Sequence, residues 1–188
     1  MIVLIDMDGP LADFEGHMLA CWRRCFPQEA FVPLRDRSNF WAREQYARID
    51  PRYPGMLNRL VGSADFFRSM PVVVGARKAV REMRQQGIQI YFCSSPLPQF
   101  PETAAAKLEW VGENFGSEMV SRTILTQDKT LVVGSILIDD NPGIKGAIRP
   151  HWKQVLWDMP FNRNAVGFPR MKRWASWPTF VGNGNKKF

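Results

Sequence analysis

The chain has few cysteines, few histidines and no hydrophobic run long enough to cross a membrane. Its three cysteines, Cys21, Cys25 and Cys93, show no C-x-x-C spacing, which argues against a structural zinc site and fits a reducing compartment. A membrane-spanning helix needs about 20 consecutive apolar residues, so we expect no membrane partner. No basic segment precedes the apolar N-terminus, and we therefore expect neither a signal nor a transit peptide and predict a cytoplasmic protein.

The composition is that of a folded protein with a basic surface. The 188 residues are 45% hydrophobic and 12% aromatic, which suits one domain with a modest insertion. The formal net charge of +7 is consistent with a nucleotide, a nucleic acid or an acidic surface as partner. We interpret much of the excess as solvated surface, and we do not expect nucleic acid to be the partner.

The N-terminal segment is an apolar run that ends on two carboxylates. Residues 2–5 read as a strand buried on both faces, followed at once by Asp6 and Asp8 and then by Gly9 and Pro10. Side chains alternate along a strand, so the two aspartates point to the same side. Like charges this close raise each other's pKa unless a cation such as Mg²⁺ lies between them. An Asp-x-Asp-Gly stretch also occurs in ordinary turns and in calcium loops.

The remaining hydrophobic pattern predicts alternating helices and strands. We expect helices over 14–26, 38–49, 55–62, 75–86 and 104–115, and strands over 2–5, 88–93, 123–125, 135–138 and 154–157. Such alternation predicts a parallel sheet with helices on both faces. Prolines repeatedly interrupt residues 26–71, which indicates a small helical insertion, and Ser38 is the expected N-cap of one of its helices.

Polar groups follow three of the five expected strands, at the ends where ligands bind in parallel α/β sheets. These groups are Asp6 with Asp8, Ser94 with Ser95, and Asp139 with Asp140; Lys129 follows a fourth strand. Each has a purely structural alternative: the serines as a loop cap, Lys129 as an exposed turn lysine, and the last aspartates as a turn. Their conjunction favours a metal-dependent phosphotransferase.

These four groups appear in the order of the four motifs of the haloacid dehalogenase-like (HAD) phosphatases, which the chain resembles up to about Trp177. Within that superfamily it is similar to the cytosolic and mitochondrial 5'(3')-deoxyribonucleotidases. The matching stretches are 6–16, 40–41, 44–46, 93–96, 125–130 and 137–140. The resemblance implies a Rossmann-like, three-layer α/β fold with a small helical cap inserted after the first motif. We expect the core over 1–14 and 72–180, the cap over 15–71 and a disordered tail over 181–188.

The resemblance also implies a division of roles. Asp6 would attack phosphorus to form an aspartyl-phosphate, and Asp8 would act as acid and then as base. Mg²⁺ would be held by the Asp6 carboxylate, the Asp140 carboxylate and the main-chain carbonyl of Asp8. Asp139 would contact these ligands without binding the ion itself. The expected phosphate-binding groups are Ser94, Ser95, Lys129 and the backbone amides around Gly9.

The insertion is expected to select the substrate. By the resemblance, the aromatic residues Phe14, Phe40, Trp41 and Phe67 would line a pocket for a pyrimidine base, although aromatic residues at helical spacing are more often core. Lys107 matches a lysine of the family and would lie near the phosphate, with a solvated helix position as the alternative. The mitochondrial relatives have a lysine where this chain has Pro98 and an arginine where it has Gln127, which puts base and sugar preference in doubt.

Three functions remain open from the sequence. The first is a magnesium-dependent 5'(3')-deoxyribonucleotidase acting on uracil or thymine deoxyribonucleoside monophosphates, with a homodimer implied by the family. The second is a phosphatase of the same fold acting on another small phosphomonoester. The third is a nucleic-acid-binding protein with a vestigial site, which only the net charge suggests.

Overall fold

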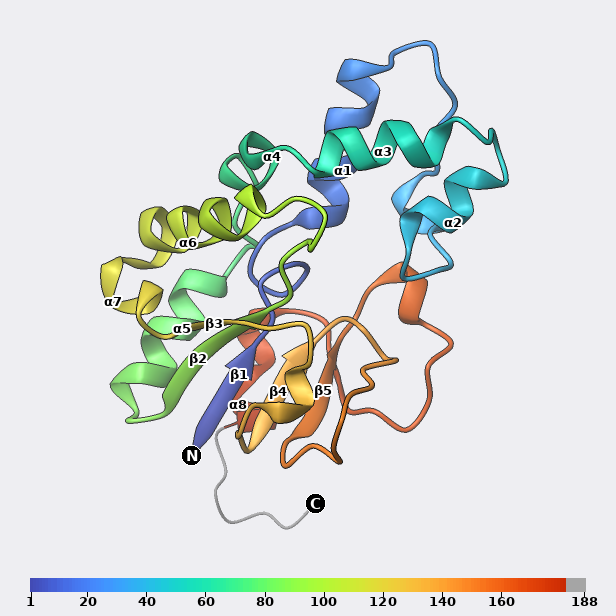
Figure 1. The fold of residues 1–188 in the computed structure, drawn as a ribbon. Coiled ribbons are helices and arrows are strands. Elements are labelled where there is room, and N and C mark those ends of the chain that lie inside the picture. The colour runs from blue at the N-terminus through green and yellow to red at the C-terminus, as the bar shows by residue number, and fades with distance from the viewer. Residues whose placement is uncertain (182–188) are drawn as a thin grey trace.

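The computed structural model describes residues 1–181 and contains one six-stranded sheet. The strands are, in chain order, β1 (Ile2–Ile5), β2 (Gln89–Ser94), β3 (Thr123–Leu125), β4 (Ile136–Asp139), β5 (Lys153–Trp157) and β6 (Arg170–Met171). They lie in the order β3-β2-β1-β4-β5-β6, and all neighbouring pairs are parallel. The predicted Rossmann-like α/β fold is therefore confirmed (Figure 1). The two-residue strand β6 was not expected.

Helical segments connect these strands. The α-helices are α1 (Phe14–Cys25), α2 (Ala42–Ala47), α3 (Tyr53–Val61), α4 (Ala64–Arg68), α5 (Ala76–Gln85), α6 (Glu102–Phe115), α7 (Ser117–Val120) and α8 (Trp177–Val181). Short 3-10 turns are η1 (Leu34–Asp36), η2 (Lys129–Leu131), η3 (Pro160–Asn162) and η4 (Trp174–Ser176). Among residues 1–181, no helix is both long and apolar enough to span a membrane.

The helix expected over 38–49 is shorter than predicted. It begins at Ala42, and Ser38 does not cap it. The Arg37 side chain donates a hydrogen bond to the Phe40 carbonyl (3.3 Å), and the Ser38 amide donates to the Gln45 side chain (3.1 Å). These contacts hold residues 38–40 in a non-helical conformation, because backbone groups bound by side chains have an alternative to helical hydrogen bonds.

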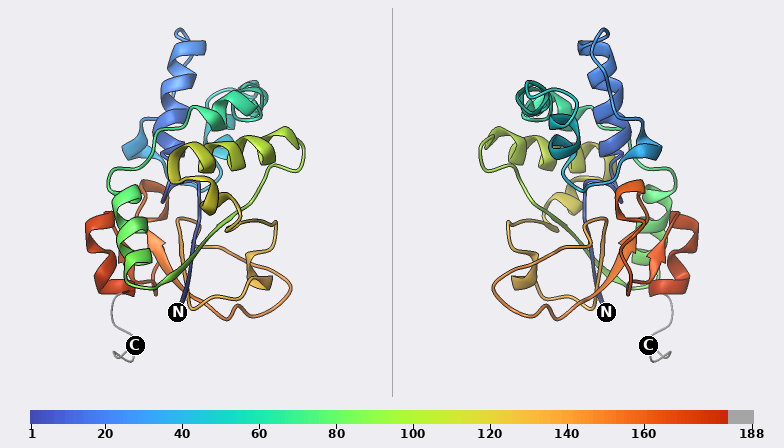
Figure 2. Two further views of the ribbon diagram at one scale, coloured as in Figure 1. Left: turned by 90° about the vertical axis from the view of Figure 1, so that its left-hand side faces the viewer. Right: turned by 90° about the vertical axis from the view of Figure 1, so that its right-hand side faces the viewer.

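The two faces of the sheet are covered differently. Alternate β1 residues Val3 and Ile5 face a large apolar cluster that contains side chains of α5, α6 and α8. Leu4 points to the other face, where it packs in a smaller cluster with Leu137 and Trp152. Figure 2 shows α5 and α8 side by side on one side of the sheet and the segment with η2 on the other. The second face is thus covered by η2 and the loop before β5, whereas an α-helical layer was expected.

Four helices inserted between β1 and α5 lie beyond the carboxyl ends of the strands, at the top of Figure 1. Where the chain leaves and re-enters the core, the Asp13 amide donates to the Pro71 carbonyl and the Val73 amide to the Leu11 carbonyl, both at 2.8 Å. This pairing ties the two ends of the inserted segment together, and the expected limits of the cap remain a prediction. At the C-terminus Val181 is buried within α8, and residues 182–188 of the expected tail lie outside the described residues.

Candidate active site

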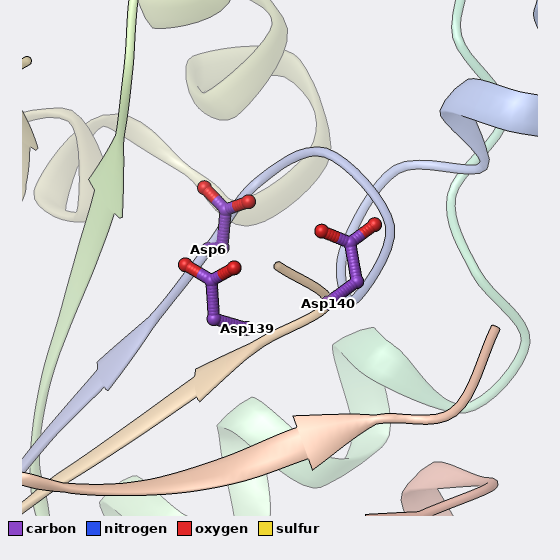
Figure 3. Close-up of side chains that lie close together, drawn as sticks. All are labelled: Asp6, Asp139 and Asp140. Atoms are coloured by element: carbon purple, nitrogen blue, oxygen red, sulfur yellow. The ribbon is translucent and has the colours of Figure 1, made fainter. Parts of the chain in front are cut away.

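Three buried carboxylates meet where β1 and β4 end. The strands are in register through Ile5 and Ile138, so the residues that follow, Asp6 and Asp139, emerge side by side, with Asp140 next along the chain. One oxygen from each carboxylate lies within 4.8 Å of the others. Figure 3 shows the three side chains converging from the two strand ends. Parallel pairing thus brings together acids that are more than 130 residues apart in the sequence.

Lys129 supplies one positive charge to this cluster. Its Nζ lies 2.7 Å from Asp6 Oδ1 and 2.6 Å from Asp139 Oδ2, and the side chain is buried. Burial opposes the charged form, but the two carboxylates outweigh burial and raise the pKa of Lys129 above its ordinary value. Its carbonyl accepts a hydrogen bond from the Trp152 indole (3.2 Å). The alternative of an exposed turn lysine is wrong.

Asp139 and Asp140 differ in how their oxygens are engaged. Asp139 Oδ2 accepts from Lys129, and Oδ1 accepts from the Asn141 amide (2.8 Å). No hydrogen bond from a residue in the described range reaches the Asp140 carboxylate, whereas its carbonyl accepts from Asn162 (2.8 Å). Burial, followed by the charge of Asp6, raises the pKa of Asp139 to about 6, against the opposing pull of Lys129.

The same cluster fits a divalent cation. Burial, Asp139 and Asp6, in that order, raise the pKa of Asp140 well above its usual range. Three carboxylates with one ammonium leave an excess of buried negative charge, and Asp140 has no donor of its own among residues 1–181. Hard cations such as Mg²⁺ prefer such oxygen ligands, so the donor set fits the expected metal, with Asp6 and Asp140 as the better placed ligands.

Lys107 of α6 forms a second ion pair. Its fully buried Nζ lies 2.6 Å from Asp8 Oδ2 and 2.8 Å from the Ser94 hydroxyl, and it lies 4.9 Å from the centre of the Phe67 ring. The alternative of a solvated helix position is therefore wrong. Burial is the main cause of a raised pKa at Asp8, Lys107 opposes it, and Asp6 adds to it. Asp8 Oδ1 is buried without a hydrogen-bond partner among the described residues.

Gly9 lies so close to Asp140 that the site leaves no room for a side chain at this position. Its φ of 103° is positive, and an added Cβ would overlap Asp140 Oδ2. Its amide donates to the Ala12 carbonyl at 2.8 Å, so the expected donation from this amide to phosphate is not available in this arrangement. Glycine here permits both the turn after β1 and the close approach of that turn to Asp140.

A cavity of about 540 Å³ connects the carboxylates with the inserted helices. Its lining includes Ser95, the carboxylates Asp6 and Asp8, and Lys129. All four expected aromatic residues line it as well, namely Phe14, Phe40, Trp41 and Phe67. Trp41 is 57% exposed and Phe67 only 1%. Ser94 is fully buried and does not line the cavity, and its hydroxyl accepts from Lys107.

The two positions that depart from the mitochondrial pattern also line the cavity. The Gln127 side-chain amide donates to the Pro96 carbonyl (2.5 Å), which ties it to the loop after β2. Pro98 is exposed on that loop. Sequence reasoning gives no role to three further cavity residues, Glu15, Asn58 and Phe161. Of these three, only Glu15 could have been found from the sequence, because it lies within the stretch 6–16 that matches the family.

Comparison with known proteins places the chain in a family. The sequence model described as "5' nucleotidase, deoxy (Pyrimidine), cytosolic type C protein" matches residues 1–182. The chain belongs to this family. A Bordetella bronchiseptica relative, named provisionally as a 5'(3')-deoxyribonucleotidase, is 42% identical over 177 residues, covering 94% of this chain and 93% of the relative. The human cytosolic-type 5'(3')-deoxyribonucleotidase is 40% identical, over 93% of this chain and 88% of the relative.

Solved structures share the fold of this chain. A Bacillus subtilis protein classed provisionally as a HAD hydrolase, and solved with bound magnesium, matches with a TM-score of 0.59 at 11% identity. The match covers 97% of this chain and 98% of that protein. At this identity the likeness concerns the fold alone, and the fold is that of the HAD hydrolases. As a deoxyribonucleotidase family member the chain is a phosphoric monoester hydrolase, which confirms the predicted enzyme class.

Proposed function

We propose that this chain is a magnesium-dependent 5'(3')-deoxyribonucleotidase that acts on uracil and thymine deoxyribonucleoside monophosphates. The observation that carries the proposal is one cavity lined both by the paired carboxylates and by four aromatic side chains. Carboxylates and Lys129 suit phosphoryl transfer, and aromatic faces suit a stacked base. The cytoplasmic location and the homodimer remain predictions.

Asp6 is the proposed nucleophile. Its Oδ1 accepts from Lys129, and within residues 1–181 no hydrogen-bond donor reaches Oδ2. In the first step an Asp6 oxygen forms a bond to phosphorus while the bond from phosphorus to the nucleoside oxygen breaks. The Lys129 ammonium lies 2.7 Å from the Asp6 carboxylate and balances part of its negative charge.

Asp8 is the proposed acid and base. Its raised pKa favours a protonated carboxyl, which can donate its proton to the departing nucleoside oxygen. The resulting carboxylate then accepts a proton from the water that attacks the aspartyl-phosphate, which releases phosphate and restores both side chains. Lys107 stabilises the carboxylate form from 2.6 Å, so it favours proton release in the first step.

Asp6 and Asp140 would hold Mg²⁺, with the Asp8 carbonyl as the further expected ligand. When bound, the ion neutralises phosphate charge as a Lewis acid. Both oxygens of Asp139 already accept hydrogen bonds, one from Lys129 and one from the Asn141 amide. Asp139 therefore orients Lys129 and is not a proposed ligand of the ion. Ser95 lines the same cavity as the carboxylates and is the proposed hydrogen-bond donor to phosphate. Ser94 instead accepts a hydrogen bond from Lys107.

Phosphate release from a panel of monophosphates tests the proposal. With Mg²⁺ present, we expect deoxyuridine and deoxythymidine 5'-monophosphates (dUMP and dTMP) to be hydrolysed with higher kcat/KM than purine deoxynucleotides, ribonucleotides and sugar phosphates. We expect chelation of Mg²⁺ to abolish the activity. Turnover of a different phosphate ester without turnover of any deoxynucleotide would show instead the phosphatase for another small phosphomonoester.

A further inference from the structure

A buried ion pair joins α1 to the segment before α2. Arg37 Nε lies 2.7 Å from Glu15 Oε2, and Arg37 Nη2 lies 3.0 Å from Glu15 Oε1. The side chains are only 1% and 8% exposed. This two-point geometry fixes the guanidinium plane, because both hydrogen bonds must be satisfied together.

The remaining guanidinium donors of Arg37 hold the loop that carries the aromatic residues. Nη1 donates to the Gln45 side-chain oxygen (2.9 Å), and Nη2 donates to the Phe40 carbonyl (3.3 Å). The Gln45 side-chain nitrogen in turn donates to the Asp36 carbonyl (2.7 Å). The position of Phe40 is therefore set by Arg37, which is itself set by Glu15.

The Arg37 guanidinium also contacts an aromatic ring that lies outside the inserted helices, in the core domain. Arg37 Cζ lies 5.7 Å from the centre of the Phe161 ring, within the range of a cation–π contact. Phe161, in η3 after β5, packs edge to face on Phe40 with centroids 5.6 Å apart, and Phe40 packs likewise on Trp41 at 5.0 Å. Phe161 lines the cavity together with Glu15. The aromatic wall thus continues from the inserted helices onto the core.

We propose that Phe161 is a further specificity-determining wall of the base pocket, and that Glu15 and Arg37 are positioning residues that hold Phe40 against it. The inference rests on the proposed function, since it assumes that a base occupies this part of the cavity. A buried ion pair is a costly way to stabilise a fold, because both charges lose their hydration. Its place here is explained by the orientation that it imposes on the aromatic wall.

Steady-state kinetics with two substrates test this role. The full chain would be assayed with Mg²⁺ on dUMP and on 2-deoxyribose 5-phosphate, which has the same phosphate and sugar but no base. For Phe161→Leu we expect KM for dUMP to rise about tenfold, a factor within the range of one stacked base, with kcat changed less than about twofold. KM for the sugar phosphate should also change less than about twofold, because that substrate has no base to stack. Arg37→Lys, which keeps the charge but loses the two-point geometry, should show the same split.

Phe115→Leu is the matched control, because Phe115 is also half-buried and packs edge to face, on Phe92 at 5.0 Å, but does not line the cavity. It should leave the ratio of the two KM values unchanged. If Phe161→Leu raises both KM values equally, or neither, the inference is wrong while the proposed function stands. If the unmodified protein shows no preference for dUMP over the sugar phosphate, both are wrong. Should Arg37→Lys fail to fold, Phe161→Leu decides alone.

Discussion

Asp139 and Asp140 are buried acids of the site whose pKa values are raised, and the direction of these shifts determines how they make stability depend on pH. The pKa of Asp139 is raised to about 6 from an ordinary value of 3.8, so between these values this carboxyl binds more protons in the folded protein than in the unfolded chain. Its contribution to the stability of the metal-free protein therefore falls as pH rises through this window. For Asp139 alone the loss amounts to at most about 3 kcal/mol. The raised pKa of Asp140 acts in the same direction.

Mg²⁺ should reverse this loss, because it binds the ionised carboxylates. We predict that the increase in Tm caused by Mg²⁺ grows as pH rises from about 5 to about 8, measured by thermal unfolding at each pH with and without the ion. Asp140→Asn should remove the increase and raise the Tm of the metal-free protein at neutral pH. Asp65→Asn, at an acid that is 90% exposed, is the control and should retain the increase. Equal increases at both ends of the pH range would contradict the assignment.

Among the structural elements, the turn after β1 decides whether the site can form. Gly9 adopts a positive φ, and the space beside its Cα is filled by the Asp140 carboxylate. An alanine would meet two separate penalties, the backbone strain and the overlap with a metal ligand. Glycine is thus required here by the site as well as by the turn.

Gly9→Ala should therefore damage the site more than the fold. We predict a loss of stability of about 1–3 kcal/mol from the strained backbone, together with loss of the Mg²⁺-induced rise in Tm and of phosphate release. Gly87→Ala is the matched control: its φ is 75°, and no atom would lie within 4 Å of the new Cβ. Gly87→Ala should lose similar stability but keep both readouts. Normal metal binding by Gly9→Ala would show that Asp140 is not a ligand.

In the molecule as a whole, much of the fold could be predicted because its signals are local. Buried strands read as apolar runs, and the rule that ligands bind at their carboxyl ends is enough to locate Asp6, Asp139 and Lys129 from the sequence alone. The two-residue strand β6 gives no such signal. The pattern places the start of α2 at Ser38, four residues too early, because side-chain hydrogen bonds from Arg37 override local propensity.

The long-range contacts of the site could not be predicted from pattern alone. Lys107 and Asp8 are 99 residues apart, and Phe161 meets Phe40 only through the packing of the core on the inserted helices. Composition and periodicity describe each segment separately, and they contain no information on which side chains meet. Family resemblance supplies a role for Lys107, but it supplies none for Arg37 or Phe161.

The most direct measurement is rapid acid quenching of the chain with dUMP carrying labelled phosphate. The account predicts protein-bound label that hydroxylamine removes, as expected for an aspartyl-phosphate on Asp6. The label should decay more slowly in Asp8→Asn, because water attack lacks its base, and should be absent in Asp6→Asn. Phosphate release with no bound label in either the unmodified protein or Asp8→Asn, or label that persists in Asp6→Asn, would contradict the account.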